Sequence, residues 1–323
     1  MNQDTQSTYP YPIAQHLRSH SQLIYGCMGL GGGWNENPIA KADIKQAQSV
    51  IETCLEHNIN IFDHADIYTF GKAEQVFGEV LKQMPSLREQ MSIQSKCGIR
   101  FADECGVKRY DFSATWINHS VDQILSRLHI EQLDVLMLHR PDPLADMEEL
   151  VKTLSALHQS GKVKCIGMSN MHVSQLKYFQ SLLPLPIICN QIELSLGSLG
   201  AINDSIEPSH HYDGLFEYSQ TQNIQIQAWG ALFQGQFTKE ITDDTPMNVR
   251  HTASLINDLA QKYSVSKEAI VLAFLTRLPV AIQPIIGTTN LERITHCAQV
   301  NKCLLSHTDW YALLESARNH DVP

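Results

Sequence analysis

The stretch Leu133-Asp-Val-Leu-Met-Leu-His139 is short and apolar at nearly every position. A run of this length without clean alternation is typical of a strand buried on both faces, as in a parallel sheet. The following segment, Arg140-Pro-Asp-Pro143, contains two prolines that prevent the strand from continuing. The stretch therefore predicts an inner strand of a parallel α/β fold.

Strand and helix patterns alternate from this stretch toward both ends of the chain. Eight such units in 323 residues, with no break in composition, favour an α/β fold built as a single (β/α)₈ TIM barrel over residues 23–323. A doubly wound open sheet is the alternative, but its dinucleotide fingerprint is missing after the first strand. The expected strands are 23–27, 59–62, 91–96, 133–139, 163–168, 187–194, 224–229 and 280–286.

Composition narrows the class of protein. The chain is 43% hydrophobic and 18% charged, a balance that allows a large buried core. Its net charge of -10, with no basic run, argues against nucleic acid and anionic membranes as partners. Eight scattered cysteines contain no CxxC pair, so neither a zinc site nor a redox dithiol is expected.

The amino-terminal segment, residues 1–22, is expected to form an arm or a short hairpin. It is polar and lacks a hydrophobic signal core, and no apolar run reaches the roughly 18 residues needed to span a bilayer. A cytoplasmic protein is therefore expected, with a monomer as the default state.

Polar side chains follow the expected strands, at the barrel face that carries active sites in this fold. Six motifs occur there in order: Phe62-Asp-His-Ala-Asp-Ile-Tyr68 with Gly71, Glu74 and Gly78; Ile93-Gln-Ser-Lys96; Leu133 to His139; Gly161-Lys-Val163 with Ile166-Gly-Met-Ser-Asn170; Asn190-Gln191; and Pro284-Ile-Ile-Gly-Thr-Thr289 with Arg293. Together they resemble the aldo-keto reductases over residues 20–320, and the first resembles a bacterial branch of predicted oxidoreductases. The resemblance implies a TIM barrel that reduces aldehydes or ketones with NADPH.

Four residues can carry the chemistry of carbonyl reduction: Asp63, Tyr68, Lys96 and His139. The carbonyl oxygen needs a proton, and a free tyrosine with a pKa of about 10 is a poor acid. A positive charge on Lys96 would lower that pKa, and Asp63 would hold Lys96 in place. His139 could orient the carbonyl, leaving Tyr68 as the proton donor. The resemblance implies the same four roles.

The resemblance implies a nicotinamide cofactor held by the later strands. Ser169, Asn170 and Gln191 would bind its carboxamide, and Trp229 would stack on its ring. Arg293 would pair with a ribose 2′-phosphate, which favours NADP over NAD. The expected cofactor residues are Met28, Asp63, Ser169, Asn170, Gln191, Trp229, Gly230, Ala231, Leu232, Gly235, Gly287, Thr288, Thr289 and Arg293.

Two departures from the family pattern concern this cofactor. Trp229-Gly-Ala-Leu232 stands where the family usually has tyrosine followed by Ser-Pro-Leu, so a serine hydrogen bond is lost. His296-Cys297 stands where a polar pair, often Glu-Asn, follows the arginine, which puts the adenine contact in doubt.

Two rival functions can be stated from the sequence. The first is a metal-dependent hydrolase, in which His64, Asp66 and His139 would ligate the metal. The later strand ends add only Glu193 as a further ligand, so no metal is expected. His64 and Asp66 are instead expected to support the loop that carries Asp63 and Tyr68. The second rival is a cofactor-binding regulatory subunit or redox sensor on the same barrel. The substrate is expected to be a small carbonyl compound, bound at a mouth lined by Trp34, Arg100, Phe101 and the loop 195–210.

Overall fold

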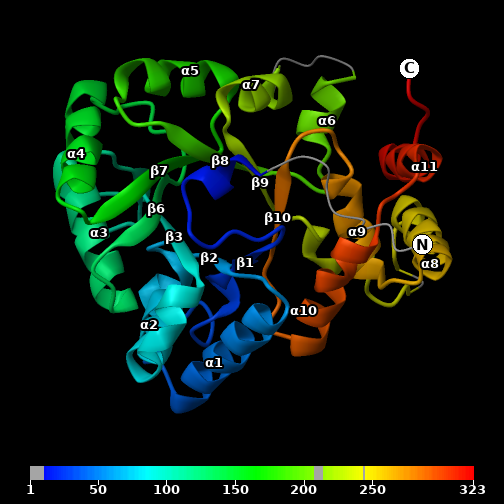
Figure 1. Ribbon diagram of the computed structural model, residues 1–323, viewed down its shortest axis with the longest axis horizontal. Coiled ribbons are helices and arrows are strands. Elements are labelled where there is room, and N and C mark those ends of the chain that lie inside the picture. The colour runs from blue at the N-terminus through cyan, green and yellow to red at the C-terminus, as the bar shows by residue number, and fades with distance from the viewer. Residues whose placement is uncertain (1–10, 207–213, 243) are drawn as a thin grey trace.

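The computed structural model describes residues 11–206, 214–242 and 244–323. Eight parallel strands close into a barrel in the order β1-β10-β9-β8-β7-β6-β3-β2, and helices surround it (Figure 1). The predicted TIM barrel is therefore confirmed. The barrel strands are β1 Ile24–Gly26, β2 Ile61–Asp63, β3 Ser92–Cys97, β6 Leu133–Leu138, β7 Val163–Ser169, β8 Ile187–Glu193, β9 Gln225–Trp229 and β10 Ile282–Ile286.

Helices follow the strands and pack on the outside of the barrel (Figure 1). They are α1 Lys41–Glu56, α2 Lys72–Gln83, α3 Ala114–Leu128, α4 Met147–Gln159, α5 Val173–Leu182, α6 Gly200–Asp204, α7 Leu215–Gln222, α8 Met247–Tyr263, α9 Lys267–Thr276, α10 Leu291–Ala298 and α11 His307–Arg318. Short 3₁₀ helices are η1 Pro12–Gln15, η2 Cys27–Gly29, η3 Tyr68–Gly71, η4 Pro85–Gln90, η5 Phe233–Gly235 and η6 Gln299–Lys302. No helix within these described ranges is long and apolar enough to cross a membrane.

The apolar run of β6 is buried on both faces, as expected for an inner strand. Val135 and Met137 pack inside the barrel, whereas Leu136 and Leu138 pack outward in the core beneath the helices. Successive side chains of a strand point to opposite faces, so a strand with two buried faces needs apolar residues at both sets of positions. This requirement explains why the run lacks alternation.

The amino-terminal end of the barrel is closed by residues 11–22. Ile13 in η1 and Leu17 join the inner core, where they pack with Ile24, Ile61 and other strand residues. The described part of the expected arm or hairpin thus contains a 3₁₀ helix rather than strands, and residues 1–10 lie outside the described residues.

One supersecondary element was not predicted. Residues 99–112, between β3 and α3, contain two short antiparallel strands, β4 Ile99–Arg100 and β5 Arg109–Tyr110. Arg100 and Arg109 both contact Asp103, at 2.7 and 3.1 Å, so ion pairs replace the alternating apolar pattern by which a hairpin is usually recognised.

Candidate active site

Lys96 on β3 connects Asp63 and Tyr68. Its ammonium donates to Asp63 Oδ2 at 2.7 Å and Oδ1 at 2.8 Å, and to the Tyr68 hydroxyl at 3.1 Å. A fourth contact reaches the carbonyl oxygen of His64 at 2.8 Å. Lys96 is 1% exposed and Asp63 is 2% exposed, so this ion pair is shielded from water.

Burial changes the acidity of this group. Burial alone would lower the pKa of Lys96, but Asp63 and Tyr68 outweigh it and raise that pKa, so the ammonium stays charged. Burial raises the pKa of Tyr68 above its ordinary value, although Lys96 acts in the opposite direction. Lys96 lowers the pKa of Tyr68 in the expected direction, but the effect of burial is larger, so the pKa is raised on balance. The phenol stays protonated at neutral pH, as a proton donor must.

His139 follows β6 and faces Tyr68. The two rings lie edge to face, with centroids 6.1 Å apart. Burial, followed by the charges of Lys96 and Arg140, holds the pKa of His139 well below its usual range. The imidazole is therefore neutral at physiological pH, and a neutral imidazole has one N–H group available to a substrate oxygen.

Asp63 is also held by a buried layer of amides, formed by Gln94 on β3, Gln191 on β8 and Gln227 on β9. Gln94 and Gln191 donate to Asp63 Oδ1 at 2.7 and 3.0 Å. Gln94 and Gln227 exchange two hydrogen bonds of 2.8 and 2.9 Å across the barrel. Gln94 and Gln191 fix the carboxylate that positions Lys96, and Gln227 holds Gln94, which makes this amide layer part of the site.

The loop that carries Tyr68 is tied to the neighbouring strand through its backbone. The His64 N–H donates to the Gln94 carbonyl at 2.8 Å, and the Asp66 N–H donates to the Lys96 carbonyl at 2.9 Å. The His64 ring packs against Phe77, with centroids 4.7 Å apart, and burial lowers its pKa to about 3. The expected role of His64 and Asp66 as supports of the Tyr68 loop agrees with these contacts.

All of the expected cofactor residues line one large cavity of about 740 Å³, here called the main cavity. It also contains Tyr68 and His139, so the expected proton donor and cofactor residues meet in one place. Trp34 lines it as expected. Its lining further includes Gly26, Gly29, Ile67, Arg140, Gln234, Thr238 and Ile285.

Near Tyr68, the main cavity is lined by the flat ring of Trp229 and by the side-chain amide of Asn170. Trp229 donates its indole N–H to Asn170 Oδ1 at 3.0 Å, which fixes the ring. The Asn170 amide nitrogen donates to the His139 carbonyl and to Ser169 Oγ, at 3.1 and 2.8 Å. Asn170 has a positive φ of 60°, a conformation that asparagine tolerates better than most residues. The protein itself uses both polar atoms of this amide.

The far end of the main cavity suits phosphate. Gly287, Thr288 and Thr289 precede α10, whose first-turn backbone N–H groups have no partner within the helix, although that of Arg293 donates to Asn290 Oδ1 at 3.0 Å. Arg293 lies in that turn, with its side chain 42% exposed and 3.4 Å from Glu268. Gly235 has a φ of 72°, which favours glycine, and a β-carbon there would stand 3.9 Å from Arg293. A cavity with a ring-binding end and a cationic end fits a dinucleotide.

The second departure from the family pattern lies outside this cavity. Neither His296 nor Cys297 lines it. Cys297 is buried in the core, and His296 lies 3.8 Å from Glu268. Glu268 therefore contacts both His296 and Arg293.

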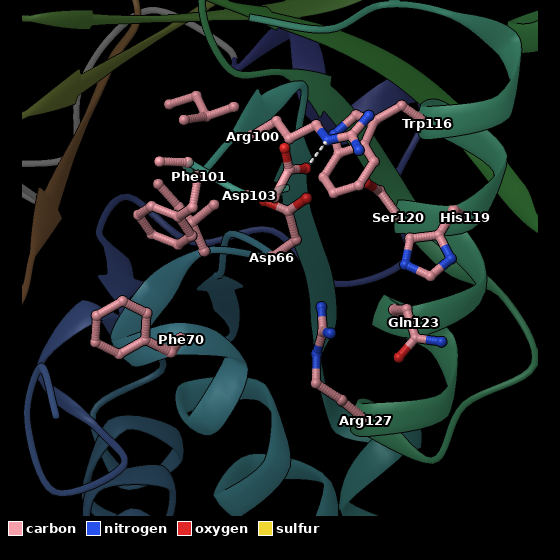
Figure 2. A pocket seen from close by; sticks show the side chains of 13 residues that line it. Asp66, Phe70, Arg100, Phe101, Asp103, Trp116, His119, Ser120, Gln123 and Arg127 are labelled. Atoms are coloured by element: carbon pink, nitrogen blue, oxygen red, sulfur yellow. Dashed lines mark hydrogen bonds and ion pairs between the residues drawn. The ribbon is translucent and has the colours of Figure 1, made fainter. Parts of the chain in front are cut away.

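A second cavity, of about 250 Å³, shares Ile67 with the main cavity. Figure 2 shows Asp66 near its centre, with Arg100 and Phe101 on one side and Arg127 on the other. Arg100 and Phe101 thus line this cavity and not the main one, contrary to expectation, because Asp103 and Asp111 hold the guanidinium of Arg100 at 2.7 and 3.0 Å. No residue of 195–206, the described part of the expected loop, lines the main cavity.

The side chains of the rival metal site are separated. His139 lines the main cavity, Asp66 lines the second one, and His64 is buried against Phe77. Across the part of the chain that the structure describes, no three acidic, histidine or cysteine side chains gather in a metal-binding cluster.

The sequence prediction missed Arg140, Gln94 and Gln227. Gln94 is two residues before Lys96, and Gln227 is two residues before Trp229, so each shares a strand face with a predicted site residue. That spacing could have revealed both glutamines. Arg140 directly follows His139, and its position could have been inferred from the end of the strand.

Comparison with known proteins places the chain among reductases. The family model described as "Aldo/keto reductase family" matches residues 22–318. The chain is 32% identical to a 6-dehydroglucose reductase of Agrobacterium fabrum over 311 residues, covering 94% of this chain and 96% of that protein. It is 34% identical to Oxidoreductase YdhF of Escherichia coli over 284 residues, covering 86% and 90%.

The fold is similar to that of an aldo/keto reductase from Klebsiella pneumoniae, solved in complex with NADP and acetate. The TM-score is 0.69 at 20% identity, with 93% of this chain and 92% of that chain covered.

Proposed function

This chain belongs to the aldo/keto reductase family, and we propose on that basis that it reduces aldehyde or ketone carbonyls to alcohols with NADPH. The observation that carries the proposal is the Asp63–Lys96–Tyr68 contact at the wall of a cavity that also contains His139. A protonated phenol next to a fixed ammonium is a proton donor whose anion is stabilised as soon as it forms.

Each of the four residues has a separate task. His139 donates an N–H to the carbonyl oxygen, orienting the substrate and stabilising the charge that develops there. Tyr68 gives that oxygen its proton, and Lys96 stabilises the phenolate left behind. Asp63 touches no reacting atom in this scheme and acts by holding Lys96. In the oxidation direction, Tyr68 acts as the base.

The cofactor is held along the main cavity. Ser169, Asn170 and Gln191 bind the carboxamide, and Trp229 stacks on the ring. Because the polar atoms of Asn170 already contact His139, Ser169 and Trp229, its part in binding requires an exchange of partners. When bound, the reduced nicotinamide supplies the hydride.

The phosphate groups lie at the start of α10, and Arg293 pairs with the 2′-phosphate that distinguishes NADPH from NADH. The K. pneumoniae neighbour was solved in complex with NADP, which supports NADP as the kind of cofactor but says nothing of Arg293. The A. fabrum relative supports a carbonyl of a polar small molecule as substrate, since its name describes reduction of an oxidised glucose.

Turnover tests the proposal directly. The protein is mixed with NADPH and a panel of aldehydes and ketones, and nicotinamide absorbance is followed. We expect consumption of NADPH that depends on the carbonyl compound. Tight NADPH binding without turnover of any compound would contradict the proposal and support the regulatory subunit or redox sensor instead.

A further inference from the structure

Two arginines line the main cavity, and only one of them has an acidic partner. Arg293 lies 3.4 Å from Glu268. Arg140, in contrast, has no carboxylate within ion-pair distance in the described ranges of the chain, and its guanidinium contacts the ring of Trp229. The acid nearest to it in sequence, Asp142, accepts instead from the backbone N–H groups of Phe112 and Leu144, at 3.1 and 2.9 Å.

Arg140 stands where a substrate would meet it. It follows His139 at the end of β6, whereas the expected cofactor contacts come from the ends of β2 and of β7 through β10, the loops that follow β9 and β10, and the loop after β1. Its guanidinium lies over the Trp229 ring, 5.7 Å from the ring centroid. A cation–π contact attracts the charge of the guanidinium without an acceptor oxygen, which leaves its N–H groups available to bind an anion.

The charges around this position favour an anion. Among the described residues, Asp63 is the only acid that lines the main cavity, and Lys96 neutralises it at 2.7 Å. Arg140 and Lys108 both act on the His139 ring, adding to the effect of burial that lowers its pKa. The substrate side of the cavity therefore carries positive charge that no acid of the described residues balances.

We propose that Arg140 selects carbonyl substrates that carry an anionic group, either a carboxylate or a phosphate. This inference rests on the proposed reductase function and names its substrate class. The guanidinium binds the anion through two parallel hydrogen bonds, while His139 and Tyr68 hold the carbonyl. Trp34 and Ile67 supply an apolar wall for the carbon skeleton between the two groups.

The first test compares matched substrates. Values of kcat/KM are measured for 4-carboxybenzaldehyde against its methyl ester, and for glyceraldehyde 3-phosphate against glyceraldehyde. A charged hydrogen-bonded contact of this kind is expected to favour the anion about tenfold or more. The two pairs distinguish a carboxylate site from a phosphate site. Preference for neither anion would overturn the proposal.

The second test assigns the preference to the side chain. Arg140→Met should abolish it, and Arg140→Lys should keep part of it, because lysine retains the charge without the paired donors. Arg100→Met is the matched control. That arginine lines the second cavity, so its loss should leave unchanged the ratio of kcat/KM for the anionic substrate to kcat/KM for its neutral counterpart. An unchanged ratio in Arg140→Met would overturn the proposal, as would equal loss of NADPH affinity, since Arg140 would then be a cofactor residue.

A binding measurement separates this inference from the proposed function. Titration of benzoate into the NADPH complex, followed by calorimetry, needs no turnover. Binding that weakens about tenfold in Arg140→Met supports the anion site even if no carbonyl is reduced. Benzoate binding that is unaffected by the substitution contradicts the site even if neutral aldehydes are reduced.

Discussion

The ammonium of Lys96 donates a 3.1 Å hydrogen bond to the hydroxyl of Tyr68 from a position that is 1% exposed. In this position the lysine cannot exchange its partners for water. Burial makes the phenol a weaker acid in the resting site, and the fixed charge stabilises the phenolate once the proton has left. In the proposed reaction, the site would therefore stabilise the product of proton transfer without ionising Tyr68 beforehand.

Replacing Tyr68 with phenylalanine removes the proposed proton donor and keeps the ring. General acid catalysis contributes about 10²- to 10⁴-fold, so kcat should fall by at least about 100-fold. NADPH binding, measured by fluorescence titration, should stay close to wild type. The matched control is Tyr178→Phe, since Tyr178 is exposed and lies outside both cavities. Retention of most activity in Tyr68→Phe would rule out Tyr68 as the acid.

Replacing Gln94 with leucine removes a 2.7 Å donor from Asp63. Loss of a hydrogen bond to a buried charged group costs about 1.5–3 kcal/mol, so we expect kcat to fall by about tenfold or more as Lys96 loses its fixed position. The KM of the carbonyl substrate should change little, because Gln94 does not line the cavity.

Gln283→Leu is the control for this variant. Gln283 is equally buried on β10 but donates to the backbone of Ser21 and not to Asp63. If both variants lose activity to the same extent, the effect of Gln94 is one of general stability and not of positioning.

Replacing Arg293 with alanine should weaken NADPH binding about tenfold or more and leave NADH nearly unaffected, because only NADPH carries the 2′-phosphate. Dissociation constants for both cofactors provide the comparison. Lys302→Ala, a loss of charge at an exposed position outside the cavity, serves as the control. Equal weakening of NADPH and NADH would refute the 2′-phosphate assignment.

Asp66 should make stability depend on pH. Burial, then the nearby Glu74, raise the pKa of its carboxyl to about 7 despite the opposing charge of Arg127. A carboxyl group whose pKa is higher in the folded state contributes its full stabilisation below the unfolded-state pKa of about 3.9. That contribution is lost as the pH rises through 7. Asp66→Asn should therefore raise the free energy of unfolding by about 2 kcal/mol at pH 8, after allowance for partial exposure, and by only about a third of that at pH 5.

Denaturant unfolding at pH 5 and pH 8 measures this difference. Asp122→Asn, which removes an exposed acid paired with Lys162, should show no such dependence. A gain for Asp66→Asn that is the same at both pH values would mean that ionisation of Asp66 is not its cause.

Most of the barrel could be predicted from the sequence, because its signal is local. Each strand is a short apolar run, and all eight lie within two residues of their expected bounds. Asp63, Tyr68, Lys96 and His139 could be found for the same reason, since each follows or ends such a run. The hairpin of β4 and β5 could not, because Arg100, Asp103 and Arg109 connect it by ion pairs that leave no apolar period.

The remaining features depend on distances across the fold. Gln94 and Gln227 are 133 positions apart in sequence but exchange hydrogen bonds inside the barrel. Arg100 looked like a pocket residue from its place after β3, but two aspartates hold it in the second cavity. The sign of the pKa change at Tyr68 depended on the balance between burial and the charge of Lys96, and a sequence reports neither quantity.

The closure of the barrel by Ile13 and Leu17 has a practical consequence for protein engineering. These side chains fill the amino-terminal end of the barrel, opposite the candidate active site. A truncation that removes them would expose the apolar residues Ile24 and Ile61 to solvent. A purification tag or reporter domain should therefore not be inserted near residue 13, where it would disturb this packing.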